Sequence, residues 1–371
     1  MRTRASVGRW VTAVLLGFAF VYACSLATSD DIPRLQLVAQ ALYFAVAAAG
    51  LNLLTGYNGQ VSIGHGAFFG IGAFTSAILI KDHGWEYLPT LPVAAVLAAV
   101  VGVLVGFPAL RVKGLYLALV TLGLATIFPD VIKRFFDESG QGQVTVRSRL
   151  LRAPEWWPAG IGDRYQWAYV LTLVLTVVAF VITAIVVRLR FGRALVAVRD
   201  HEAAATTLGI DPARVKLGAF GLSAAYAGIA GSLSVLVLGN AEANKATTFN
   251  LSILFLIAVV VGGTATVLGP LVGGWFVVML QDQVNTFAER PDRLLGLPVP
   301  GPVEDFVRGK TVLTPAIFGI VLVVSMYLLP DGIVGASRRG WNRAWAAAQR
   351  RRIPAPVPAS DGPDPQRKDR T

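Results

Sequence analysis

Stretches of about 20 mostly apolar residues recur along this 371-residue chain, separated by short polar connections. A helix of about 20 residues, rising 1.5 Å per residue, crosses the roughly 30 Å of hydrocarbon in a bilayer. Because 54% of the residues are hydrophobic and only 15% are charged, an ordinary soluble domain is excluded. The sequence therefore predicts an all-α, polytopic integral membrane protein with about ten transmembrane helices. The expected spans lie near residues 8–28, 35–55, 61–81, 89–109, 114–133, 166–187, 215–238, 250–265, 268–285 and 312–330.

Basic residues flank the apolar spans instead of gathering on one face. The chain has 33 Lys and Arg against 22 Asp and Glu, a net charge of +11, which in a soluble protein would suggest nucleic acid. When the spans alternate from a cytoplasmic amino terminus, most of the Lys and Arg fall on the cytoplasmic side, as the positive-inside rule expects. We therefore expect a multi-pass protein in a lipid bilayer, with both termini cytoplasmic and no nucleic-acid partner.

The composition divides the chain into three parts. Residues 1–34 hold the first span and the first outer loop, and residues 35–330 form a core with a cytoplasmic loop at 188–216. Residues 331–371 form a basic, Pro-rich cytoplasmic tail. The single cysteine, Cys24, excludes an intramolecular disulfide.

A Gly-rich segment at 51–74 interrupts the second and third spans with polar residues. Backbone without helical hydrogen bonds survives at membrane depth only where it is buried in protein or lines a water-filled cavity. The segment therefore indicates a translocation pathway, although a lone histidine is more often hydrogen-bonded structure than a ligand. The candidate pathway residues are Asn58, Gln60, Ser62 and His65.

A second Gly-rich break, at 261–274, separates the eighth and ninth spans. Interrupted segments in both halves of a transporter point to its substrate route. Both breaks also contain pairs of glycines spaced four apart, which lets neighbouring helices approach closely. Helix packing is the expected role of Gly66, Gly70, Gly269 and Gly273.

The loop between the sixth and seventh spans predicts a short helix followed by a sharp stop. Asp200 is placed to cap a helix over 203–208, Gly209 suits the left-handed turn that ends it, and Pro212 prevents its continuation. Small residues give this helix a smooth surface that a partner's groove can hold closely. A simple amphipathic linker is the alternative interpretation.

These segments together resemble a known family. Ala204 and Ala205, with Gly209 four positions later, resemble the cytoplasmic "EAA" loop of ABC importer permeases, and residues 192–216 are similar to its form in branched-chain amino-acid permeases. Residues 51–73, 111–125 and 268–273 are similar to the same family. The acidic residue of the general loop pattern would fall at Ala203, whereas this chain has Glu202.

The resemblance implies the ABC importer permease fold in the cell membrane of a prokaryote. It implies a second homologous permease subunit, two cytoplasmic ATPase subunits and an extracytoplasmic solute-binding protein as partners, and leucine, isoleucine and valine as substrates. The chain itself would be a transport subunit without enzymatic activity or a bound cofactor, and ATP would be used by the partner subunits. The residues implied in coupling to the ATPase are Arg199, Glu202, Ala204, Ala205 and Gly209.

Other activities have less support in the sequence. Residues 201–205 begin like a zinc-protease helix but lack its second histidine, so no metal site is predicted. An ion-coupled secondary transporter usually needs ionisable residues inside the membrane, and only Asp130 and Asp282 lie near the spans, close to their expected ends. An ABC permease for urea or short amides is the alternative that the polar, small-residue breaks leave open.

Overall fold

The computed structural model describes residues 31–110, 115–135, 142–154 and 164–289, with isolated short pieces between 293 and 335 and at residue 17. The chain separates into two units, Met1–Gly335 and Ala336–Thr371, and all the described residues belong to the first. The expected span 8–28, most of the span 312–330 and the tail beyond 335 lie outside the described residues.

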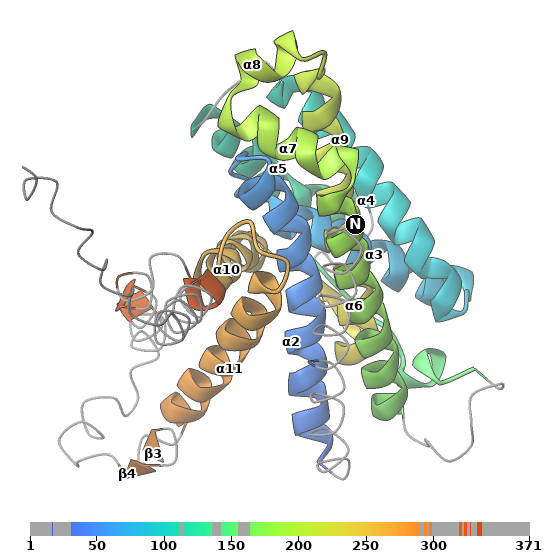
Figure 1. Cartoon of the computed structure of the whole chain (residues 1–371). Coiled ribbons are helices and arrows are strands. Elements are labelled where there is room, and N and C mark those ends of the chain that lie inside the picture. The colour runs from blue at the N-terminus through green and yellow to red at the C-terminus, as the bar shows by residue number, and fades with distance from the viewer. Residues whose placement is uncertain are drawn as a thin grey trace, which may run out of the picture. The chain divides into compact units, whose positions relative to one another are not determined.

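Helices dominate the described residues, as the sequence predicts, and each expected span from 35–55 to 268–285 contains one of them (Figure 1). Within the part of the chain that the structure describes, five helical segments are long and apolar enough to cross a membrane: Ile32–Tyr57, Tyr87–Pro108, Tyr116–Phe135, Arg164–Arg188 and Pro212–Leu238. The helices are α2 (Ile32–Leu51), α3 (His65–His83), α4 (Tyr87–Ala109), α5 (Leu115–Phe135), α6 (Arg164–Arg188), α7 (Arg190–Asp200), α8 (Glu202–Thr207), α9 (Pro212–Leu238), α10 (Lys245–Gly262) and α11 (Gly269–Glu289). A π-helical turn, η1 (Asn52–Tyr57), extends α2, and a 3₁₀ turn, η2, covers Ser148–Leu151.

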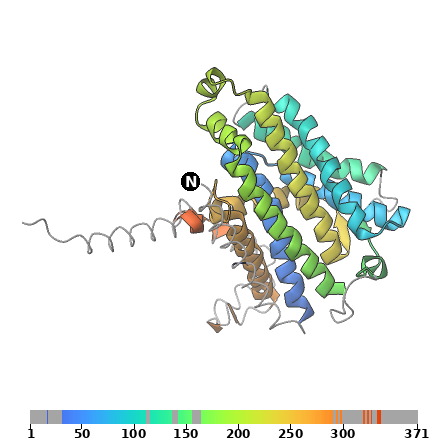
Figure 2. The ribbon, with the colours of Figure 1, turned by 45° about the vertical axis from the view of Figure 1, so that its right-hand side comes forward.

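The helix α9 lies at the centre of the bundle and packs against α4, α3 and α2. Its ends are encoded locally: the Asp211 side chain accepts hydrogen bonds from the first turn, Pro212 occupies the start, and Gly239 ends the helix with φ of 82°. Glycines let the neighbours approach closely, because a Cβ on Gly72 would collide with the Gly228 backbone and one on Gly231 with Phe69. In both views α4 runs alongside α9 (Figures 1 and 2).

The two ends of the bundle carry different structures. At one end α7 and α8 form a compact helical loop, at the top of Figure 1. At the other, β1 (Gln143–Thr145) pairs antiparallel with β2 (Asn240–Glu242), which follows the far end of α9. The strand β1 of the polar segment 133–165 and the loop 188–216 therefore lie at opposite ends of α9, as the alternation of spans predicts. Two further short strands, β3 (Arg293–Leu294) and β4 (Leu297–Pro298), form a separate hairpin.

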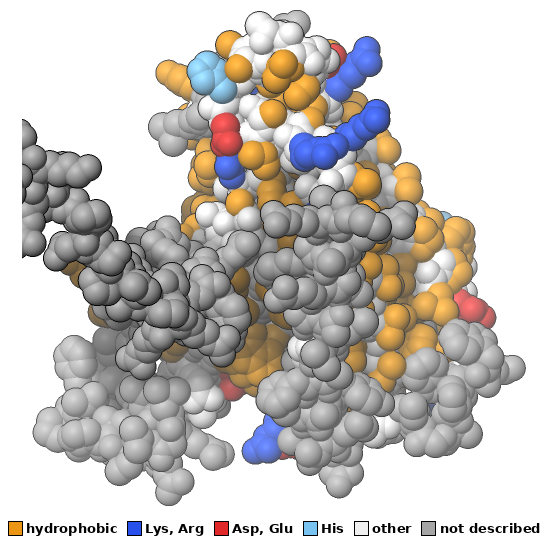
Figure 3. Space-filling model, in the orientation of Figure 1, with side chains coloured by type: hydrophobic (Ala, Val, Ile, Leu, Met, Phe, Trp, Pro, Cys, Tyr) orange, Lys and Arg blue, Asp and Glu red, His pale blue; other side chains and the backbone are white. Residues whose placement is uncertain are grey.

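Hydrophobic side chains cover much of the described flank below the α7–α8 end, where charged side chains gather (Figure 3). Exposed apolar side chains of the helices include Leu104 and Phe107 of α4 and Ile127 of α5. A helix surface that is apolar and yet unburied suits contact with lipid. Exposure of this kind distinguishes α4, α5 and α6 from the largely buried α2 and α9.

Candidate functional site

The loop that joins α6 to α9 contains two short helices, α7 and α8, where the sequence predicts one. Gly209 ends α8 with φ of 78°, so the predicted left-handed turn is present. Asp200 does not cap α8, which corrects the expected cap. It is the last residue of α7, and the extended residue that precedes α8 is His201, with φ of −156° and no side-chain cap.

The predicted small-residue surface of α8 divides into an exposed face and a buried one. Ala203, Ala204 and Gly209 are exposed, whereas Ala205 is 2% exposed and packs against the rest of the loop. The tip of the loop also presents Leu208, which is 80% exposed. Leu208 was not among the predicted site residues. Its position directly before the helix-ending Gly209 was the available signal.

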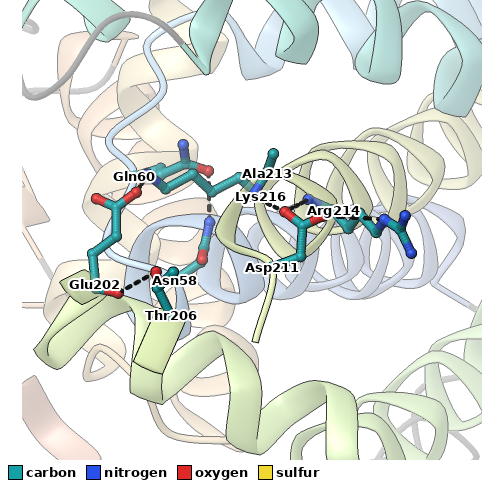
Figure 4. Close-up of polar contacts among 8 residues, drawn as sticks. All are labelled: Asn58, Gln60, Glu202, Thr206, Asp211, Ala213, Arg214 and Lys216. Carbon is teal, nitrogen blue, oxygen red and sulfur yellow. Dashed lines mark hydrogen bonds and ion pairs between the residues drawn. The ribbon is translucent and has the colours of Figure 1, made fainter. Parts of the chain in front are cut away.

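Glu202 forms an ion pair inside the chain. Its Oε1 atom lies 2.6 Å from Nζ of Lys216, and the two side chains are 35% and 11% exposed. Figure 4 shows this pair together with the cap that Asp211 provides for the first turn of α9. The pair joins α8 to the beginning of α9, so that the loop is held to the central helix.

Arg199 connects the loop to the first chain break. Its Nη1 atom donates a hydrogen bond of 2.8 Å to the carbonyl of Gly56, and its other nitrogens contact the Asp200 carboxylate at 2.9 Å. The stem of the side chain lies against Gly59, where φ is 73° and a Cβ would approach Arg199 Cγ to 2.7 Å. A glycine is therefore required at this position both by the backbone conformation and by the close approach.

The first break begins with the π-helical turn η1 and continues as non-helical backbone to α3. Single π-helical turns often mark functional positions in helices, because the backbone is locally widened. Gly56 within η1 has no room for a side chain, since a Cβ would collide with Asn52 Oδ1 and lie 2.6 Å from the amide nitrogen of Ala265.

The side chain of Asn52 joins the two breaks. Its Nδ2 atom donates a hydrogen bond of 2.8 Å to the carbonyl of Thr266, and its Oδ1 accepts one of 2.9 Å from the amide of Ala265. Among the described residues, Ala265 alone of the non-glycine residues has a positive φ, of 54°. Sequence analysis did not select Asn52 as a site residue; the available signal was an amide in the apolar run 35–55.

The four predicted pathway residues are all buried within the first break and the start of α3. Asn58 donates a hydrogen bond of 2.6 Å to Gln60, as Figure 4 shows, and His65 Nε2 lies 2.9 Å from the carbonyl of Ala47 in α2. Three of their polar atoms are buried without a hydrogen-bond partner: Asn58 Oδ1, Ser62 Oγ and His65 Nδ1. Buried polar atoms are usually satisfied by protein or ordered water, so these three atoms are positions where water or a solute can bind.

The predicted packing glycines each lie where a Cβ would meet neighbouring backbone or an aromatic ring. A Cβ on Gly66 would collide with the Thr248 carbonyl of α10, and one on Gly70 with the ring of Phe128 in α5. In the second break, Gly269 lies against the Gly263 carbonyl, and Gly273 lies against the Ala258 carbonyl of α10. These contacts bring α10 close to α3 and α11.

Comparison with known proteins identifies relatives over most of the chain. A family model described as the permease component of branched-chain amino acid transport systems matches residues 34–329. The high-affinity branched-chain amino acid transport permease LivM of Escherichia coli is 31% identical over 305 residues, covering 77% of this chain and 70% of that protein. LivM of Salmonella typhimurium is 31% identical over 287 residues, covering 72% and 66% respectively. A probable LivM of Methanocaldococcus jannaschii is 24% identical over 347 residues, covering 87% and 93%. No solved structure matches the chain.

Proposed function

Because this chain belongs to the family of branched-chain amino acid ABC transport permeases, we propose that it is the membrane-spanning subunit of an ATP-driven importer of leucine, isoleucine and valine. The chain is a multi-pass membrane transport subunit and not itself an enzyme. The proposed assembly contains a second homologous permease, two ATPase subunits that use ATP on the cytoplasmic side, and a solute-binding protein outside. In this proposal the chain binds no cofactor or metal of its own.

The hydrogen bond from Arg199 to Gly56 is the observation that carries the coupling part of this proposal. The exposed tip of the loop, which contains Ala204, Leu208 and Gly209, is the surface proposed to dock on an ATPase subunit. Movement of that tip reaches Arg199 through α7, and from there the backbone of the first break. Asn52 then extends the connection to the second break. Energetic coupling between distant sites requires contiguous elements of this kind with two arrangements.

The first break is the proposed translocation pathway. Asn58, Ser62 and His65 each keep a buried polar atom without a partner, which supports a segment that meets water or solute when the break rearranges. The hydrogen bond from Asn58 to Gln60 is one polar contact within this segment. In a membrane transporter, non-helical backbone is tolerated where it lines such a route.

The proposed orientation places the α7–α8 end in the cytoplasm and the β1–β2 end outside, with both termini cytoplasmic. The charge distribution of the whole sequence supports it: when the spans alternate, most Lys and Arg fall on the side of the loop 188–216, and the end of the bundle that holds this loop is opposite to the strand pair. The solute-binding protein is then expected to meet the β1–β2 end.

The test compares the same substitution at two glycines that have similar backbone conformations. Gly209 and Gly84 both end helices with positive φ, and at both a Cβ would meet nothing within 4 Å. In transporters reconstituted with the partner subunits, Gly209→Arg is expected to abolish leucine uptake while ATP hydrolysis continues, because the docking tip is blocked. Gly84→Arg adds the same charge and backbone strain, and is expected to leave uptake largely intact. Equal uptake by the two variants would contradict docking at this tip.

A further inference from the structure

A cavity of about 230 Å³ lies between α2, α3, α9, α10, α11 and the strand β2. Gly66, Gly70 and Ala73 of α3 form one wall. Leu238 and Glu242, which also line the cavity, are exposed, so its mouth lies at the β2 end. A solute that arrives at that end meets this cavity before it reaches the first break.

The walls of the cavity are chemically divided. One part is apolar and is formed by Phe44, Phe69, Leu251 and Leu254. The other part offers hydrogen-bonding groups, and among the described residues that line the cavity none is Lys or Arg. Small-molecule sites generally combine apolar walls with a few polar groups that fix orientation. The polar lining residues are Gln40, Tyr43, Ser234, Asn240, Glu242, Thr248 and Gln281.

The size of the cavity suits a small aliphatic solute. A cavity of about 150 Å³ lined by Leu, Ile and Phe is enough to hold benzene. The present cavity is larger, and its polar edge provides amide groups at Gln40 and Gln281. An amide oxygen accepts hydrogen bonds from an ammonium group, and amide N–H groups donate to a carboxylate.

We propose that this cavity is a recognition subsite for an aliphatic amino acid on the transport route. The aliphatic side chain occupies the Phe44–Leu254 wall, and the ammonium and carboxylate groups meet the polar edge. This inference rests on the proposed transport function. It adds the place where the solute binds and the residues that select it.

Cysteine accessibility tests the site directly. In a Cys24→Ala background, the Thr248→Cys variant places one thiol in the cavity, and Asp82→Cys places one at the exposed end of α3. Assembled transporters in membrane vesicles are treated with a small water-soluble methanethiosulfonate reagent, with and without L-leucine. We expect L-leucine to slow modification of Thr248→Cys at least several-fold and to leave Asp82→Cys unchanged. An unreactive thiol at position 248, or equal rates with and without leucine, would overturn the proposal.

Selectivity provides a second measurement that separates this inference from the proposed function. Leu254→Ala enlarges the cavity, and we expect phenylalanine uptake to rise several-fold relative to leucine uptake. Leu256→Ala removes the same atoms from α10 without touching the cavity and should keep the original ratio. Wild-type transporters that take up no aliphatic amino acid would reject the proposed function. Wild-type uptake with identical selectivity in the two variants would reject the cavity alone.

Discussion

The two chain breaks interrupt helices in similar ways but are held by different contacts. The first, at 52–64, is bonded both to the α7–α8 loop through Arg199 and to the second break through Asn52. The second, at 263–268, is bonded to the first break through Asn52, and the hydroxyl of Thr266 bonds to the backbone of Gly263 and Gly269. The first break therefore lies between the loop and the second break in this series of contacts.

Removing the hydrogen bonds between the two breaks should change stability the most. Asn52→Ala leaves the half-buried amide of Ala265 and the carbonyl of Thr266 without their partner, which should lower the free energy of unfolding by about 1–3 kcal/mol. Asn58→Ala truncates the same type of side chain in the same break, but it removes only a local contact with Gln60. It should therefore lower the free energy of unfolding by less. Thermal unfolding of the purified variants measures the difference. If the two variants lost equal stability, the breaks would not be joined as described.

Removing the hydrogen bond between the loop and the first break should reduce leucine uptake more strongly than it reduces the stability of the protein. Arg199→Ala is expected to lower leucine uptake roughly tenfold, with ATP hydrolysis retained, because the loop no longer pulls on Gly56. Arg199→Lys keeps the charge but lacks the planar guanidinium group, so its leucine uptake should lie between those of the wild type and Arg199→Ala. Arg193→Ala on the exposed face of the same helix is the matched control. Normal uptake by Arg199→Ala would remove Arg199 from the coupling route.

The smallest expected effect tests the backbone of the second break. Ala265 holds a left-handed conformation that costs a non-glycine residue about 1–2 kcal/mol, and glycine adopts it freely. Because glycine also loses more entropy on folding, Ala265→Gly should raise the free energy of unfolding by less than about 1 kcal/mol. Chemical denaturation in detergent measures this change. A clear loss of stability would show that the Ala265 side chain contributes packing that outweighs the backbone strain.

The length of the apolar stretches predicted the helices well, because crossing a bilayer requires a long apolar segment whatever its neighbours are. The predictions failed where two local rules competed. Asp200 is a good capping residue, but α7 continues through it, and its carboxylate pairs with Arg199 instead. Ala205 belongs to the predicted docking surface, yet the turn of α8 directs it into the loop. Such outcomes depend on the exact helix ends, which local sequence fixes poorly.

Local chemistry was enough to predict the all-α membrane class, the positions of the breaks and the left-handed turn at Gly209. These features follow from apolar length, glycine content and allowed backbone angles. The bonds of Asn52 to residues 265 and 266, the bond of Arg199 to Gly56, and the cavity beside α3 and α10 depend instead on how the helices pack. These contacts join segments far apart in the chain, and their energies arise only when the packed helices bring the groups within hydrogen-bonding distance.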